Sequence, residues 1–479
     1  MKQSNADKVS QRVLPTQVTF TEEKVQPDGR KAKTVKTEYG EKPVKCETEK
    51  WFSGLFSSQK VEPNNPKDRE WFKTEKMKVI KEKVQLKRAY LDGSITMEEL
   101  KLTLRRMKRR KTPGPDGVPT ECYRNLPGPA LQVLLLILNH VMRSEKGLQE
   151  WKSSTIQTLH KGGPVDQLNN YRPIALLNVS YKIFTRILYQ RMYCVMEGEG
   201  LLSDAQGGWR KGISTATKIS TLIGVIQDSK DKNKPLHLVY IDIRKAYDTI
   251  EYWMLQRVLS EMGFSPKIKR LIQNLYKGVH SDVVTAYGKS GKINIKRGVR
   301  QGCPLSPLLF MLCMEPLLHW LKESRMGYKV DEELQINVQA WADDVVLIAR
   351  SREEMQTLTD MFLKYCDEYG LTLNTDNKDK SAYTSNDKEA ERHGLRIRSW
   401  LPLPPEGADP ELLKKDRFPF LHPHESYKYL GVQMTLTLDW TYQEETCERK
   451  LKRQLAFLKQ RRFDSTQCIH VFNTVILPA

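Results

Sequence analysis

The chain has 479 residues, 39% of them hydrophobic and 9% aromatic, which is enough for about three domains with buried cores and excludes a wholly disordered chain. Lys and Arg number 78 against 58 Asp and Glu, and the formal charge of +20 is typical of a protein that binds a polyanion, unless it serves solubility alone. The eight cysteines form no C-x-x-C pair, the N-terminus carries no apolar signal segment, and the longest apolar run is too short to span a membrane. We therefore expect an intracellular protein without zinc ribbons, structural disulfides or a membrane partner.

Residues 1–90 are rich in Lys and Glu and contain few apolar anchors apart from WFSGLFSS. They predict a basic, partly disordered extension with a docking patch around Trp51 and Phe56. The next segment, ITMEELKLTLRRMKRRK, has helical spacing and ends in a basic tract from Arg105 to Lys111. This tract is consistent with a solvated helix end, a phosphate-contacting patch or a nuclear import signal.

Residues 112–121 (TPGPDGVPTE) predict an ordered turn or a flexible loop, and residues 131–142 (LQVLLLILNHVM) predict a buried helix. Residues 156–192 predict a strand, a loop, a second strand and an amphipathic helix. Beyond them, strand-like and helical segments alternate irregularly, which favours an α+β fold over a doubly wound sheet. Residues 385–425 are rich in proline and charge and predict a surface insertion.

In LVYIDI the side chains alternate between two faces, which places Asp242 at the end of a strand, on one face with large residues. Six residues later, Asp248 stands three positions before Glu251, the spacing of a helix capping box. We therefore interpret Asp248 as a helix cap rather than a catalytic group.

INVQAWADDVVLIA predicts a strand, a tight turn and a second strand, with Asp343 and Asp344 at the tip. Ionised carboxylates are costly to desolvate, so their place between two apolar strands needs compensation. The plain interpretation is an Asp-rich turn. The alternative is that Asp242 joins them to hold two Mg²⁺ ions, roughly 4 Å apart, for phosphoryl transfer.

From about Ile95 onward, the order of motifs resembles the reverse transcriptases of non-LTR (LINE-like) retrotransposons. The similar segments are KTPGPDGVPTE before the fingers, NNYRPIALLNVSYKIFTRIL in the fingers, LSDAQGGWRKGIST after them, YIDIRKAYDTI as motif A, RGVRQGCPLSPLLFMLCMEPL as motif B, WADD as motif C, YGLTLNTDNKDKS as motif D and YKYLGV as motif E. Each segment alone is moderately specific, but the full set in this order is very hard to obtain by chance.

The resemblance implies that Asp242, Asp343 and Asp344 ligate two Mg²⁺ ions, with Mn²⁺ as a possible substitute, and that Ile243 lends a backbone carbonyl. It implies that Lys380 protonates the pyrophosphate leaving group, although Lys378 competes for this role.

The implied nucleotide contacts are Lys161 and Arg172 for the triphosphate, Tyr247 as the steric gate against a ribose 2′-hydroxyl, and Gln301 and Gly302 for the nucleotide and the template base. An Arg fork binds phosphate oxygens bidentately, whereas Lys acts as a point charge. The prolines and serine of CPLSPLL are expected to shape a turn and begin a helix.

The implied primer grip is Tyr429, Leu430 and Gly431. The chain departs from the family pattern at Trp341, where Tyr or Phe is usual, and at Trp209, where Phe is common. We expect altered nucleotide or primer contacts from these changes rather than loss of activity, because the carboxylates and Gly302 are intact.

The implied fold is a right-hand polymerase of the α+β class whose palm carries an antiparallel sheet. The expected ranges are the extension at 1–90, fingers with part of the palm at 91–235, palm at 236–433, and the start of a truncated thumb at 434–479. No endonuclease-like pattern is present, so we expect either a fragment or a separate endonuclease domain or protein.

The expected activity is RNA-directed DNA synthesis from dNTPs on an RNA template and a DNA primer, in target-primed reverse transcription in the nucleus. One alternative is a non-catalytic or maturase-like RNA-binding protein on the same fold, which would have no need of the intact Asp242, Asp343, Asp344 and Gln301. An intron-encoded reverse transcriptase fits motif B less well. A viral RNA replicase is disfavoured by Tyr247.

Overall fold

The structure is a computed structural model, and it describes residues 14–25, 31–63, 69–402, 416–460 and 464–471. The chain forms two compact units, each assembled from separate stretches of sequence. The first unit comprises Met1–Asp204, Lys245–Glu323 and Tyr365–Thr372, and the second comprises Ala205–Arg244, Ser324–Lys364 and Leu373–Ala479. The chain passes from the second unit to the first between Arg244 and Lys245, within the segment that resembles motif A.

The N-terminal region of the first unit is more structured than expected. An antiparallel hairpin of β1 (Gln17–Val25) and β2 (Lys31–Tyr39) leads into α1 (Glu41–Phe56). Phe52 and Phe56 are buried against apolar side chains that include Val283. The expected docking patch exists, but it docks within the chain and orders this part of the extension; residues 1–13, 26–30 and 64–68 lie outside the described ranges.

A five-stranded sheet, in the order β4-β3-β6-β7 with β8 also paired to β6, forms the core of the first unit. Within it β3 pairs parallel with β6 and the other pairings are antiparallel. The predicted run of strand, loop, strand and helix is confirmed by β3, β4 and α7. The strands are β3 (Ser153–His160), β4 (Tyr171–Leu176), β6 (His280–Thr285), β7 (Gly288–Lys289) and β8 (Ile293–Asn294).

Helix α1 packs against this sheet at β6 and β8, and the other helices of the unit pack largely on one another, with apolar faces buried at the spacing expected of amphipathic helices. The α-helices of the first unit, besides α1, are α2 (Glu75–Leu86), α3 (Arg88–Asp92), α4 (Met97–Arg106), α5 (Thr120–Arg124), α6 (Gly128–Ser144), α7 (Val179–Gly198), α9 (Ala246–Thr249), α10 (Tyr252–Glu261), α11 (Pro266–Tyr276) and α12 (Ser306–Glu323). Short 3₁₀ turns lie at Glu70–Phe72, Gln149–Lys152 and Leu168–Asn170.

The buried helix predicted at residues 131–142 forms, but only one of its faces is buried. Helix α6 forms there, but Val133, Leu136 and Ile137 are 55%, 64% and 39% exposed. Only its other face is covered. There the Asn139 side chain accepts a hydrogen bond from the Ile95 amide and donates one to the Ile95 carbonyl. An apolar run identifies a helix but does not show how many of its faces are covered.

The proline- and glycine-rich segment before the fingers is an ordered turn. Gly114 lies so close to Asn178 that an added Cβ would overlap the backbone of that residue. The Asn178 side chain accepts a hydrogen bond from the Asp116 amide at 3.4 Å and donates one to the Glu150 carbonyl at 3.1 Å. Glycine is needed here because two backbone segments come into contact.

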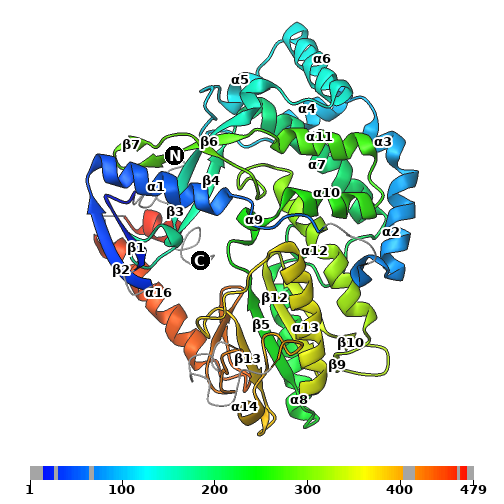
Figure 1. Ribbon diagram of the computed structural model, residues 1–479, viewed down its shortest axis with the longest axis vertical. Helices are drawn as coiled ribbons and strands as arrows, with labels where there is room; N and C mark the ends of the chain where they lie inside the picture. Colours follow the sequence, from blue (N-terminus) through cyan, green and yellow to red (C-terminus); the bar gives the residue numbers. More distant parts are fainter. Residues whose placement is uncertain (1–13, 26–30, 64–68, 403–415, 461–463, 472–479) are drawn as a thin grey trace. The chain divides into compact units, whose positions relative to one another are not determined.

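The second unit is built on an antiparallel four-stranded sheet in the order β11-β12-β5-β13 (Figure 1). One face is packed against α8 (Thr215–Asp231), whose Leu222 and Val225 share a core with Leu238 and Tyr240 of β5, as the alternation in LVYIDI predicted. The strands are β5 (His237–Asp242), β11 (Val338–Trp341), β12 (Asp344–Ala349) and β13 (Ala382–Ser385).

Two small hairpins and four further helices complete the described part of the second unit. The hairpins are β9 (Tyr328–Lys329) with β10 (Gln335–Ile336), and β14 (Tyr427–Tyr429) with β15 (Val432–Met434). The helices are α13 (Arg352–Tyr369), which runs on into the first unit, α14 (Ala390–His393), α16 (Thr441–Gln460) and α17 (Ser465–Val471).

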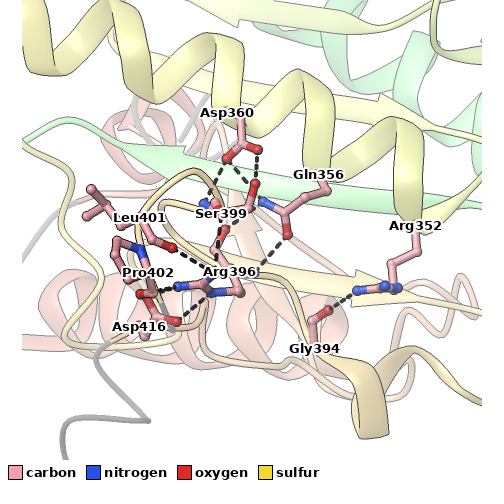
Figure 2. Close-up of polar contacts among 9 residues, drawn as sticks. All are labelled: Arg352, Gln356, Asp360, Gly394, Arg396, Ser399, Leu401, Pro402 and Asp416. Carbon is pink, nitrogen blue, oxygen red and sulfur yellow. Dashed lines mark hydrogen bonds and ion pairs between the residues drawn. The ribbon is translucent and has the colours of Figure 1, made fainter. Parts of the chain in front are cut away.

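The proline- and charge-rich insertion is tied to α13 by a network of polar contacts (Figure 2). The guanidinium of Arg396 donates to both carboxylate oxygens of Asp416, at 2.7 and 3.3 Å, and to the carbonyl of Pro402 at 3.3 Å. The backbone of Arg396 exchanges hydrogen bonds of 2.9 and 3.0 Å with the Gln356 side chain. Arg396 therefore holds together the two residues that border segment 403–415, which lies outside the described ranges.

The fold thus combines helices with largely antiparallel sheets, as the α+β expectation stated. Within the described ranges, no helix is both long and apolar enough to cross a membrane.

Candidate active site

Two paired strands of the second unit bring the motif A and motif C carboxylates to one end of its sheet. In the antiparallel register of β5 and β12, Asp242 is directly opposite Asp344. Ala342 and Asp343 form a two-residue turn between β11 and β12, and Ala342 has the positive φ of 60° that such hairpin turns require. The hairpin prediction is confirmed with one refinement, because Asp343 lies in the turn whereas Asp344 is already the first residue of a strand.

The turn is supported by a segment to which we assigned no site residue. Gln206 is fully buried, and its side-chain oxygen accepts hydrogen bonds from the amides of Ala342 at 2.8 Å and Gly208 at 2.9 Å. The Gly207 amide donates to the carbonyl of Ala340 at 2.8 Å. An added Cβ on Gly207 would lie 2.9 Å from the Trp341 ring, so the paired glycines of AQGGWR allow close contact with the WADD turn.

Asp242 is half-buried and has three neighbours from the segment that carries motif D. Its backbone amide donates to the Ser381 hydroxyl at 3.0 Å, and the Asn374 side chain donates to its carboxylate at 3.2 Å. The Lys380 ammonium lies 3.9 Å from the same carboxylate, whereas Lys378 pairs with Glu425 at 2.5 Å. Of the two lysines weighed from sequence, Lys380 is therefore the one beside Asp242. Asn374 was missed because asparagine in LTLN has no distinctive spacing.

The predicted primer-grip residues form a tight hairpin. Leu430 and Gly431 connect β14 to β15, both with positive φ, of 47° and 95°. Positive φ at both positions marks a two-residue hairpin turn, in which glycine is strongly favoured. Tyr429 is almost fully buried in the core shared with α8, so it supports the hairpin from within.

Tyr427, to which no role was assigned, lies beside Tyr240 and the motif D segment and is subject to the charges of Asp344 and Asp242. Its ring stacks on Tyr240 at a centroid distance of 3.9 Å, and its hydroxyl donates to the carbonyl of Lys380 at 2.6 Å. Burial raises the pKa of Tyr427, and the negative charges of Asp344 and Asp242 raise it further. The signal in the sequence was the strand alternation of YKY, which places Tyr427 and Tyr429 on the same face.

The donor set at this end of the sheet suits a hard divalent cation, because it consists of carboxylate oxygens with a neighbouring backbone carbonyl at Ile243. Among the residues that the structure describes, no three His, Cys, Asp or Glu side chains are already gathered around a common point for a metal ion. What favours binding is the strand register, which fixes Asp242 opposite Asp344 and leaves both accessible.

The predicted triphosphate contacts belong to the first unit and lie at the end of the β3–β4 hairpin. Lys161 directly follows β3, and its amide donates to the carbonyl of Asn170 at 2.8 Å. Arg172 is the second residue of β4 and pairs with Leu159. Both cations are exposed on the same hairpin end.

Tyr247 lies in α9, a single helical turn within the motif A segment. Its ring stacks on Phe310 of α12 at a centroid distance of 4.6 Å and an interplanar angle of 16°. The carbonyl of Tyr247 accepts a hydrogen bond from the Val299 amide at 2.7 Å. The Gly298 amide donates one to the carbonyl of Ile250 at the same distance. Motif A and motif B are thus joined by backbone bonds on either side of Asp248.

The interpretation of Asp248 as a helix cap is wrong. Asp248 lies inside α9, and the N-cap of α10 is Glu251, whose side chain caps nothing. Asp248 is buried, and its carboxylate accepts a hydrogen bond of 2.8 Å from the side-chain nitrogen of Gln301. The capping spacing is present in the sequence, but the chain turns at Ile250 between two separate helices.

Gln301 and Gly302 are held against β4. The carbonyl of Gln301 accepts a hydrogen bond of 2.6 Å from the Ala175 amide. Gly302 has a φ of 122°, and an added Cβ would overlap the carbonyl oxygen of Ala175. As predicted, the CPLSPLL segment turns and then begins α12 at Ser306.

Besides Lys161, the first unit has another lysine near the predicted triphosphate contacts. This is Lys245, which is subject to the charges of Lys161 and Asp248. It has a left-handed backbone with a φ of 46°, and its ammonium stands 4.3 Å from the centroid of the Trp51 ring. Burial and the positive charge of Lys161 lower the pKa of Lys245 to about 8, and Asp248 opposes this shift. The first unit therefore brings Lys161, Lys245, Asp248 and Gln301 into one electrostatic neighbourhood.

Comparison with known proteins places this geometry in a family. Residues 159–434 match the family model described as reverse transcriptase (RNA-dependent DNA polymerase), which spans more than half of the chain. The chain therefore belongs to the reverse transcriptase family, and the resemblance to the reverse transcriptases of non-LTR retrotransposons is confirmed.

Among its relatives, the Pol polyprotein of a type-1 retrotransposable element R2 from Nasonia vitripennis is 29% identical over 55% of this chain and 25% of its own length. The RNA-directed DNA polymerase of the mobile element jockey from Drosophila melanogaster is 23% identical over 81% of this chain and 40% of its own length. A 149 kDa protein of transposon TX1 from Xenopus laevis is 24% identical over 64% of this chain and 23% of its own length. The chain thus spans between about a quarter and two fifths of these relatives.

Proposed function

We propose that this chain is an RNA-directed DNA polymerase that adds dNTPs to the 3′-hydroxyl of a DNA primer annealed to an RNA template. The observation that carries the proposal is the register of β5 and β12, in which Asp242 and Asp344 are paired beside the turn that holds Asp343. A protein that only binds nucleic acid has no need to maintain three carboxylates, which repel phosphate, at one end of a sheet.

In this proposal Asp242, Asp343 and Asp344, with the carbonyl of Ile243, hold two Mg²⁺ ions, for which Mn²⁺ can substitute. Such ions stabilise the attacking and leaving oxygens of a phosphoryl transfer. Lys380 stays beside Asp242 as a cation that can neutralise or protonate the pyrophosphate leaving group. Tyr429, Leu430 and Gly431 support the primer end, and Tyr427 lines the same side.

The nucleotide contacts are proposed for the first unit. Lys161 and Arg172 bind the triphosphate, Tyr247 excludes a ribose 2′-hydroxyl, and Gln301 with Gly302 contacts the nucleotide and the template base. The stacking of Tyr247 on Phe310 supports the gate. Phe310 restrains the face of the Tyr247 ring and the hydrogen bond from Val299 restrains its backbone, so the ring cannot move aside when a ribose 2′-hydroxyl approaches.

For the whole protein we propose a right-hand polymerase, with fingers at 91–235, palm at 236–433 and the start of a thumb from 434. It would act in target-primed reverse transcription in the nucleus, with an endonuclease domain or separate endonuclease nicking the target. Support comes from the names of the relatives, among them RNA-directed DNA polymerases and retrotransposable elements, and from the exposed basic tract at Arg105 to Lys111.

Primer extension by the purified chain on an RNA template with an annealed DNA primer tests the proposal. We expect incorporation of dNTPs that requires Mg²⁺ and strongly exceeds that of rNTPs. Asp343→Asn should lower the rate by about a thousandfold, because the metal contributions to phosphoryl transfer are worth several kcal/mol.

Asp331→Asn is the matched control, because Asp331 is an aspartate in a turn of the same unit, between β9 and β10. It should retain the wild-type rate. Incorporation by Asp343→Asn at the wild-type rate would refute the assignment, and template binding without any incorporation by the wild type would favour the binding-only alternative.

A further inference from the structure

Asp248 is a buried carboxylate that the proposed chemistry does not use. It is 3% exposed, it lies inside the short helix α9, and burial raises its pKa to about 6. Burying a carboxylate is costly, and a neutral side chain could accept one hydrogen bond at lower cost. The residue therefore calls for a role that depends on its charge.

The bond between Asp248 and Gln301 determines which way the Gln301 amide faces. The two ends of a glutamine amide are nearly identical in shape but opposite in hydrogen bonding, since one end donates and the other accepts. An ionised carboxylate only accepts, so it must face the nitrogen end, as it does here at 2.8 Å. The oxygen end of the amide is then directed away from Asp248.

The main chain around Gln301 is held by several contacts. The carbonyl of Gln301 accepts from the Ala175 amide, and the next residue, Gly302, lies against the same strand. Nearby, the Val299 amide donates to the carbonyl of Tyr247 and the Gly298 amide donates to the carbonyl of Ile250, which joins α9 to the turn before α12. These backbone contacts do not set the rotation of the half-buried Gln301 amide, and the hydrogen bond to Asp248 acts on that rotation.

Three cations surround Asp248: Lys245 just before α9, Lys161 after β3, and Arg297 before the turn that contains Gln301. Their charges favour the ionised carboxylate and oppose the effect of burial. Lys161 is itself a proposed triphosphate contact. The cations therefore stabilise the ionised form of Asp248, which is the form that accepts from the Gln301 nitrogen.

We propose that Asp248 is a positioning residue that holds the Gln301 amide in one orientation for its contact with the incoming nucleotide. This inference rests on the proposed polymerase function, in which Gln301 touches the nucleotide. Asp248 acts only through Gln301, so its substitution has no consequence once the Gln301 side chain is gone.

A double-mutant cycle in the primer-extension assay tests this dependence. Asp248→Asn keeps the shape but lets the two amides pair in either orientation, and it should lower kcat/KM for dNTP about tenfold, mainly through KM. In a Gln301→Ala background the same substitution should change kcat/KM by less than about twofold. A tenfold loss in both backgrounds, or no loss in the wild-type background, would overturn the proposal.

Glu315→Gln is the matched control, because Glu315 is a buried carboxylate of the same unit that accepts from the Ser203 amide at 2.8 Å. It removes a buried charge without touching Gln301, and it should leave KM for dNTP unchanged. A similar rise in KM for this variant would assign the effect of Asp248→Asn to general loosening of the fold.

A second measurement does not need activity. In protein labelled with ¹⁵N-glutamine, the side-chain amide signal absent from Gln301→Ala identifies Gln301, and its chemical shift should report the hydrogen bond that this nitrogen donates to Asp248. The signal should therefore shift in Asp248→Asn and stay in place in Glu315→Gln. A Gln301 signal that is the same in Asp248→Asn as in the wild type refutes the inference, whereas wild-type protein that fails to incorporate dNTP but shows the shift refutes the proposed function alone.

Discussion

Gly302 illustrates how one residue can be required by the backbone around it. Its φ of 122° is strained for any other L-residue, and a Cβ would overlap the carbonyl of Ala175. We expect Gly302→Ala to lower the free energy of unfolding by about 3 kcal/mol, from backbone strain and overpacking together, and to impair dNTP incorporation. Urea denaturation and primer extension measure the two effects.

Gly128→Ala is the control for this substitution. Gly128 begins α6, has open space around the position of a Cβ, and does not have a positive φ. Its replacement should leave stability unchanged or raise it by less than about 1 kcal/mol, because alanine restricts the unfolded chain. Equal losses in both variants would mean that the close contact with Ala175 does not matter.

At this scale the sequence predicted residues but not their partners. Asp242, Asp343 and Asp344 were recognisable because carboxylates beside apolar strands are unusual. Asp248 was misread because its local spacing imitates a cap, while its actual partner, Gln301, lies 53 residues away. Local spacing carries no information about a contact between side chains that only the tertiary fold brings together.

Among the elements, helix α1 is the one whose packing in the core was not predicted from the sequence. Phe52 is fully buried on the sheet of the first unit, in a cluster with Ile156 and Val283. We expect Phe52→Ala to lower the free energy of unfolding by about 3–5 kcal/mol, because a buried aromatic ring is lost and a cavity remains. Thermal or urea unfolding of the full chain measures this loss.

Lys50→Ala, in the same helix, removes an exposed side chain that pairs with Glu47 and should change stability little. Equal unfolding curves for wild type and Phe52→Ala would show that α1 is not part of the cooperative core. The composition of residues 1–90 could not reveal this docking, because a few aromatic residues are enough to anchor a helix when a complementary surface lies elsewhere in the chain.

Strongly patterned elements were predicted well for a clear reason. The WADD hairpin and the β3–β4–α7 run combine alternating or helical apolar spacing with turn residues, so two local signals agree. Helix α6 carried a single signal, an apolar run, and its exposed Leu136 shows that such a run does not reveal what covers it. The bounds of the two units do not follow from such local signals, since each unit is assembled from separated segments.

For the molecule as a whole, the charge of +20 has a measurable consequence. Binding to an RNA–DNA duplex should weaken by about a thousandfold or more between 50 and 200 mM salt, as expected for roughly six or more phosphate contacts. Fluorescence anisotropy with a labelled duplex at several salt concentrations gives the slope. Affinity that does not change with salt would mean that the charge serves solubility alone.

The basic tract offers a local version of the same test. Arg105, Arg106 and Arg109 are exposed, and Arg124 holds the backbone of the tract through the carbonyls of Arg105 and Met107. If the tract contacts phosphates, replacing Arg105, Arg106 and Arg109 together by glutamine should reduce the salt slope by about two units. An unchanged slope would identify the tract as a solvated helix end.

The contacts of Arg396 identify a position at which a peptide can be inserted into the chain. One guanidinium donates hydrogen bonds to the carbonyl of Pro402 and to the carboxylate of Asp416, so the residues that border segment 403–415 are held together by a contact outside that segment. Lengthening a chain segment whose ends are already joined is inexpensive, at about 0.6 kcal/mol for each doubling. A fluorophore-binding or affinity peptide inserted between these two residues would report on the protein, or immobilise it, while both termini stay unmodified.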